Sequence, residues 1–136
     1  MEKKFELLEH TADFRIRAMG SSKEELFKNA LAGMASVQKK DVLNKKAAVS
    51  RPVFIESIDL NALLVDFLSE VLSLSDSNQE VYMVIEFKEF TDTVIDAELK
   101  GISVDRFDED IKAVTYHGAD IHKVGDELEV TIIFDI

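Results

Sequence analysis

The sequence predicts a single α+β domain covering residues 1–136, in which a mixed, mostly antiparallel β-sheet structure packs against two amphipathic α-helices. The length is that of one ordinary domain, and 46% hydrophobic residues are enough to bury a core. The third observation is the order of the periodic segments: two strands, a helix, a strand, a second helix and then a run of strands. Strands gathered in this way are typical of the α+β class.

Two short strands are predicted at 4–8 and 14–19, because apolar and charged residues alternate there. A helix follows at 23–38. It begins after Ser22, which forms the capping-box pattern with Glu25 three residues later. The apolar residues of this helix recur every three or four positions, which predicts one buried face: Leu26, Phe27, Ala30, Leu31 and Met34.

The middle of the chain predicts a strand and the stronger of the two helices. Pro52, the only proline, is expected to open a strand at 53–58. Asp59 is a favourable N-cap for a helix at 60–74, which has a continuous apolar face. The polar residues at 73–78 are expected to end this helix.

The last third of the chain has the two-residue period of strands. A hairpin is predicted from strands at 81–87 and 95–99. Short strands are expected at 112–116 and 120–123, and Gly125-Asp126 forms the turn into a final apolar strand.

Charge is divided unevenly along this chain, whose net charge is −11. Residues 1–51 carry 11 basic and 7 acidic side chains, whereas residues 52–136 carry 5 basic and 20 acidic ones. Such an acidic chain repels phosphate backbones, so tight nucleic-acid binding is not expected. Several lysines form a basic loop at 39–46, which we interpret as a complement to the dipole of the preceding helix, with a docking patch as the alternative.

Several function classes are excluded by composition. The chain has no cysteine, which excludes a disulfide framework, a thiolate zinc site and a cysteine nucleophile. No apolar run is long enough for a transmembrane helix, and the N-terminus has no signal-peptide pattern, so a cytoplasmic location without membrane contact is expected. There is also no glycine-rich phosphate loop and no nucleophile elbow.

Two carboxylates lie in unusual places. Asp13 is at the entrance to a strand, where propensity favours an apolar residue, and Asp135 directly follows the most apolar strand. Together with the terminal carboxylate of Ile136, they would form a hard, oxygen-only site for Ca²⁺, Mg²⁺ or Mn²⁺ if the two ends of the chain meet. From the residues alone, a solubilising end charge is the favoured explanation of Asp135.

Two other metal sites are disfavoured. The three histidines, His10, His117 and His122, lack the helical spacing of metalloprotease ligands. The acidic loop at 105–110 lacks the glycine and the glutamate spacing of an EF-hand, so we interpret it as a solvated loop.

Four segments resemble the archease family, in the order in which the family has them: 5–13, 24–30, 112–118 and 130–136. The resemblance spans the whole chain. His-Thr-Ala-Asp at the end of the first segment is weak by itself. Joined to Lys-Ala-Val-Thr-Tyr-His-Gly in the third segment and to the terminal Asp-Ile, it is specific.

The resemblance implies a protein cofactor that is not itself an enzyme. Archeases activate the RtcB-type tRNA-splicing RNA ligase by promoting its guanylylation from GTP and its multiple turnover. By similarity, Asp13 and Asp135 would bind a divalent metal ion, with the carboxylate of Ile136 as a further ligand. Calcium is the expected ion, and magnesium or manganese are the alternatives. His10 and His117 match motif positions of the family, and we assign them to support of the loops.

One departure from the family concerns Phe14 and Arg15, which stand where many relatives have small or aliphatic residues. The expected metal ligands are intact, whereas contacts made by this strand in the family are not carried over to this chain. Two other functions remain open: a general chaperone, which should expose apolar surface, and a stand-alone metal-dependent hydrolase.

Overall fold

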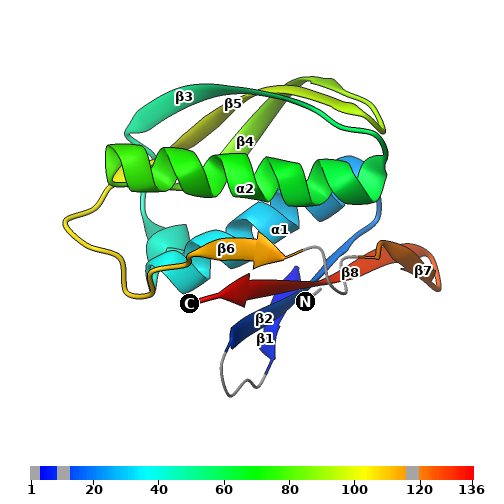
Figure 1. Cartoon of the computed structure of the whole chain (residues 1–136), viewed down its shortest axis with the longest axis horizontal. Coiled ribbons are helices and arrows are strands. Elements are labelled where there is room, and N and C mark those ends of the chain that lie inside the picture. Colours follow the sequence, from blue (N-terminus) through cyan, green and yellow to red (C-terminus); the bar gives the residue numbers. More distant parts are fainter. Residues whose placement is uncertain (1–3, 9–12, 116–119) are drawn as a thin grey trace.

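The computed structural model describes residues 4–8, 13–115 and 120–136, and in this part of the chain two α-helices and a short 3₁₀ helix accompany eight strands (Figure 1). In chain order the elements are β1 (Phe5–Leu8), β2 (Asp13–Gly20), α1 (Lys23–Gln38), η1 (Val42–Asn44), β3 (Val49–Glu56), α2 (Leu60–Asn78), β4 (Glu80–Phe90), β5 (Val94–Ser103), β6 (Ala113–Thr115), β7 (His122–Val124) and β8 (Glu127–Asp135).

The strands form two sheets rather than one. The first has the order β1-β2-β8-β6, with β7 also paired to β8, and the second has the order β3-β5-β4. Every pairing among the described strands is antiparallel. The predicted α+β class is confirmed, whereas the separation into two sheets was not visible in the sequence, because alternation shows which residues share a face but not which strands share a sheet.

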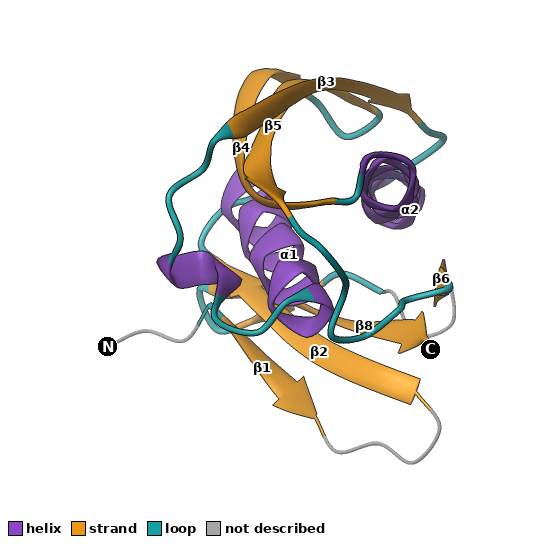
Figure 2. Ribbon diagram, turned by 90° about the vertical axis from the view of Figure 1, so that its left-hand side faces the viewer, coloured by secondary structure: helices purple, strands orange, loops and turns teal. Residues whose placement is uncertain are grey.

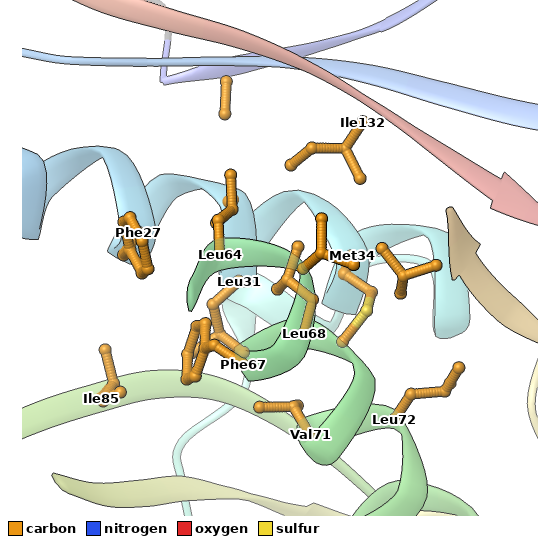
Figure 3. Packing of buried hydrophobic residues seen from close by; sticks show 14 of the residues in the cluster. Phe27, Leu31, Met34, Leu64, Phe67, Leu68, Val71, Leu72, Ile85 and Ile132 are labelled. Carbon is orange, nitrogen blue, oxygen red and sulfur yellow. The ribbon is translucent and has the colours of Figure 1, made fainter. Parts of the chain in front are cut away.

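The two helices lie between the sheets (Figure 2). Helix α1 packs against β2 and β4, and α2 packs against β3 and β6. Their apolar faces meet the inner faces of both sheets in one continuous core (Figure 3). The largest fully buried side chains of the chain include Phe27, Leu31, Phe67, Leu68 and Phe134.

The helix starts follow from their caps. Helix α1 has the bounds that the sequence predicts, and the amide of Glu25 donates to the Ser22 hydroxyl at 3.1 Å. Helix α2 begins after Asp59, whose carboxylate accepts from the amide of Ala62 at 2.8 Å. Each cap satisfies an amide that has no partner within its own helix.

Several predicted boundaries are wrong, among them the ends of β4 and β5, and two of them have a clear physical reason. Strand β3 begins at Val49, so Pro52 lies inside it, which is tolerated because β3 is an outer strand of its sheet. Helix α2 runs on to Asn78 through residues that we expected to end it. Serine and aspartate are only weak helix formers, and the helix continues until Gln79 adopts a left-handed conformation with φ 55°.

The basic loop after α1 is held by the acidic loop at 105–110. The ammonium of Lys39 donates to the carbonyl oxygen of Arg106 at 3.3 Å, and the amide of Lys40 donates to Asp108 at 2.7 Å. The last turn of α1 contains no basic residue, but Lys39 is the C-cap, so Lys39 and Lys40 lie at the negative end of the helix dipole.

A buried polar network joins β3, β4 and the end of α2. Glu80 is only 4% exposed, and its carboxylate accepts from the Arg51 guanidinium at 2.9 and 3.0 Å. The Tyr82 hydroxyl donates to the same carboxylate at 2.7 Å and accepts from the Asn78 amide at 3.3 Å. Hydrogen bonding to Arg51 lowers the pKa of Glu80, whereas burial, followed by the bond to Glu80, raises the pKa of Tyr82 to about 12.

We expect this tyrosine to make the free energy of unfolding fall in alkali. An unfolded tyrosine loses its proton near pH 10, whereas folded Tyr82 keeps it up to about pH 12. The contribution of protonated Tyr82 to the free energy of unfolding is therefore complete below pH 10 and is lost as the pH rises to 12. Two pKa units correspond to about 2.7 kcal/mol. Urea unfolding of the wild type and of Tyr82→Phe at a series of pH values measures this alkaline loss of the free energy of unfolding. An equal alkaline loss in the variant would contradict the assignment.

Candidate functional site

Asp13 and Asp135 lie directly opposite each other in the pairing of β2 with β8. Side chains at opposed positions of an antiparallel pair share a face, with Cβ atoms about 4.5–5.5 Å apart. On its other side, Asp135 is opposite Ala113 of β6. The two acidic residues therefore meet where β2 begins and β8 ends, next to the C-terminus (Figure 1).

The pair lies on the outer face of the five-stranded sheet. Alternate residues of β2 and β8, among them Ile16 and Ile132, are fully buried against the helices. Asp13 and Asp135 have the opposite parity, so their side chains are on the face turned away from the core. The site is thus held by a packed sheet but open to solvent or to a partner.

Two contacts define the surroundings of the pair. The Arg15 guanidinium Nε is 3.4 Å from Oδ1 of Asp13, and these two side chains are 48% and 27% exposed. The amide of Lys112 donates to the carbonyl oxygen of Asp135 at 2.7 Å, which fixes the end of β8 to the residue before β6. The contact of Arg15 with Asp13 was not predicted from the sequence, although residues two apart on a strand lie on the same face of the sheet.

The donor chemistry of this pair fits a hard cation. Two carboxylates directly opposite each other repel, and a divalent ion or another positive group compensates that repulsion. Within residues 4–8, 13–115 and 120–136, no three His, Cys, Asp or Glu side chains gather into a metal-binding group. Among the described residues, the side-chain donors at this point are therefore two carboxylates, and a cation bound here would need further oxygen ligands, of which the carboxylate of the adjoining Ile136 is one candidate.

One of the three histidines lies within the described residues. His122 is exposed on β7, and its Nδ1 lies 3.0 Å from the carbonyl oxygen of Asp120. His10 and His117, which we assigned to loop support, lie outside the described residues. The structure therefore brings together Asp13 and Asp135 among the predicted site residues, with Ile136 directly following in the chain.

None of the described helices is both long and apolar enough to cross a membrane.

Comparison with known proteins gives one consistent result. The family model described as "Archease protein family (MTH1598/TM1083)" matches residues 5–136. The chain is 35% identical over 144 residues to the protein archease of Methanosarcina barkeri, with 98% of this chain and 97% of the relative covered. It is 33% identical over 131 residues to the protein archease of Thermococcus kodakarensis, with 91% and 92% covered.

Two solved structures are similar to this chain over nearly their whole length. The solution structure of protein 1598 of Methanobacterium thermoautotrophicum superposes with a TM-score of 0.78 at 31% identity, covering 98% of this chain and 99% of the other. The crystal structure of a Thermotoga maritima archease, described as a possible chaperone, has a TM-score of 0.66 at 21% identity, covering 100% and 98%. The second similarity concerns the fold alone.

Proposed function

The chain belongs to the archease family, and on that premise we propose that it activates an RtcB-type tRNA-splicing RNA ligase. In this proposal it promotes guanylylation and multiple turnover of the ligase and is not an enzyme by itself. It acts in the cytoplasm through contact with the ligase rather than with RNA, which agrees with its net charge of −11. The observation that carries the proposal is the position of Asp13 directly opposite Asp135 at an open end of the sheet.

In this mechanism the two aspartates hold a divalent cation, with the carboxylate of Ile136 as a further ligand. Calcium is the expected ion, and magnesium or manganese are the alternatives. When bound, such an ion supplies positive charge that offsets the repulsion of the two carboxylates and attracts phosphate oxygens. The residues of this chain position it: the β2–β8 ladder fixes the spacing of Asp13 and Asp135, and Lys112 anchors the end of β8.

We further propose that this acidic end enters the metal-dependent cleft of the ligase. There, Asp13 and Asp135 would hold a divalent cation, and the acidic end would favour the arrangement in which the ligase histidine is guanylylated. A protein that binds one of two states of a partner shifts the partner toward that state, so the effect requires preferential binding to the competent state.

Multiple-turnover ligation tests the proposal. The ligase of the same organism is given GTP, Mn²⁺ and RNA ends bearing a 3′-phosphate and a 5′-hydroxyl, with and without this protein. We expect the protein to increase the number of products formed per ligase, because it resets the guanylylated state after each ligation. An unchanged product count at saturating protein would overturn the proposal.

A general chaperone is the second candidate, because the Thermotoga maritima relative is described as a possible chaperone. Large exposed apolar side chains do occur in the described chain, and they belong to separate elements: Leu7, Leu43, Phe54, Ile58, Val84, Val124 and Ile136. Of these, Leu43 and Val84 line a common groove, and the others are singly exposed, as is normal in monomeric proteins, so we favour the ligase cofactor. Suppression of the thermal aggregation of an unrelated enzyme would favour the chaperone instead.

A metal-dependent hydrolase remains the third candidate. Incubation of the protein alone with the same RNA and Mn²⁺ separates it from the cofactor, since only a hydrolase releases product without the ligase.

A further inference from the structure

A groove of about 530 Å³ lies between α1, β1, β4 and η1. Figure 2 shows these elements, with α1 between β4 and β1 and η1 beside it. The lining of the groove is largely apolar and includes Phe5, Ala32, Leu43, Met83 and Ile85. Neither of the paired aspartates belongs to it, so the groove is a separate feature of the surface.

Two strand edges border this groove. Strand β1 is the outer strand of the five-stranded sheet, and β4 is the outer strand of the three-stranded sheet. Within the described chain, each has one edge that no other strand pairs with. The register of β4 shifts between Tyr82 and Val84, so Met83 is left out of the ladder at the groove. The free edge of a sheet can pair with an added strand through main-chain hydrogen bonds. A β-bulge at such an edge changes the direction in which a side chain points.

The charged residues of the groove are mainly cationic. Lys4 and Lys28 line it, and in the described part of the chain neither forms an ion pair. The ammonium of Lys28 instead lies 5.9 Å from the centre of the Phe87 ring. Glu25 also lines the groove, but its carboxylate accepts from the Ser21 amide at 3.0 Å and from the Ser21 hydroxyl at 3.1 Å. These neutral donors leave the charge of Glu25 in place, so Lys4, Lys28 and Glu25 together carry a net charge of +1, on a chain that is acidic overall.

The lysines of the basic loop add to this charge. Lys45 and Lys46 directly follow η1, whose Leu43 lines the groove, and both are exposed. Lys45 and Lys46 lie well beyond the C-cap of α1 at Lys39, so for these two lysines we follow the interpretation as a docking patch and not the one based on the helix dipole. A concentration of exposed lysines near an apolar groove favours a partner of opposite charge.

We propose that this groove binds an extended, acidic segment of a partner protein. The segment lies along the free edge of β4, places an apolar side chain against the exposed Leu43 and Val84, and directs carboxylates toward Lys4 and Lys28. An extended segment fits because its side chains alternate, so one face enters the apolar floor while the other carries charge. This inference is independent of the metal site and of the ligase.

A synthetic peptide tests the proposal directly. The probe is an acetylated and amidated octapeptide in which glutamate alternates with valine, titrated into the ¹⁵N-labelled protein at low salt. We expect amide shifts confined to residues 4–5, 25–32, 42–44 and 83–85, and no binding of the counterpart with lysine for glutamate. Lys28→Glu should lower the association constant by about ten-fold or more, because it turns an attraction into a repulsion.

The matched control is Lys123→Glu, which changes the same charge at an exposed lysine of β7 and should leave peptide affinity within about two-fold. Asp13→Asn should also bind the peptide as the wild type does, which separates this proposal from the ligase function. Absent binding, or shifts outside the groove, would overturn the proposal. Tighter binding of single-stranded RNA at the groove, or self-association that Lys28→Glu abolishes, would overturn it in favour of a nucleic acid or a second copy.

Discussion

Replacing Asp13 or Asp135 by asparagine is expected to weaken calcium binding by about ten-fold or more and to abolish stimulation of the ligase. Each substitution removes one of the two opposed carboxylates and leaves the shape of the side chain almost unchanged. The fold should persist, because the pair is on the outer face of the sheet and loss of one charge relieves the repulsion between them. Calorimetric titration with calcium and the multiple-turnover assay measure the two effects, and thermal unfolding verifies the fold.

Stability separates a functional effect from a structural one. The contact of Arg15 with Asp13 is exposed, so its loss costs at most about 1 kcal/mol. Asp126→Asn, at the exposed turn between β7 and β8, removes an equal charge and should change neither calcium affinity nor stimulation. If Asp13→Asn and Asp135→Asn fold and stimulate as the wild type does, the site is assigned wrongly.

A separate variant tests the proposed role of the Ile136 carboxylate as a metal ligand. One glycine added after Ile136 converts its carboxylate into a peptide group and moves the terminal charge one residue outward, while both aspartates remain. We expect an intermediate loss of calcium affinity, and an unchanged affinity would exclude this carboxylate as a ligand.

The helices and the local hairpins could be predicted because their signals are local. The caps at Ser22 and Asp59 and the three-to-four spacing of apolar residues set the helix starts. The turn at Gly125-Asp126, where Gly125 has φ 63°, is local in the same sense. The end of α2 was missed because no strong helix breaker marks it, and the strand containing Pro52 was misjudged because tolerance of proline depends on whether a strand is at an edge.

The candidate site depends on pairing between the two ends of the chain. The sequence identified Asp13 and Asp135 as misplaced carboxylates, but nothing local determines that β2 pairs with β8 or that these two residues are opposite. That register follows from packing, because a slip by one residue would turn the buried Ile16 and Ile132 toward solvent. The groove was missed for a related reason: it exists only because the edges of two sheets and a helix come together.

Gly101→Ala is expected to destabilise the protein by about 4 kcal/mol or more, because a Cβ at this position has no space. It would lie 2.0 Å from the carbonyl oxygen of Val81 and 2.8 Å from the Cα of Tyr82, both backbone atoms. Gly101 is in the central strand of the three-stranded sheet, opposite Val49 on one side and Tyr82 on the other. Relief would require β4 and β5 to separate where the bulge already disturbs their ladder.

Gly33→Ala is the matched comparison, since it adds the same methyl group to another buried glycine. Its Cβ would meet the side-chain Cδ1 of Ile16 at 2.6 Å, an atom that can move, and alanine is favoured over glycine inside a helix by about 1 kcal/mol. We therefore expect Gly33→Ala to remain within about 1 kcal/mol of the wild type, while Gly101→Ala lowers the melting temperature by about 10 °C or more or prevents folding. Equal melting temperatures for the two variants would show that β4 and β5 can move apart at little cost, and that their close approach does not require a glycine.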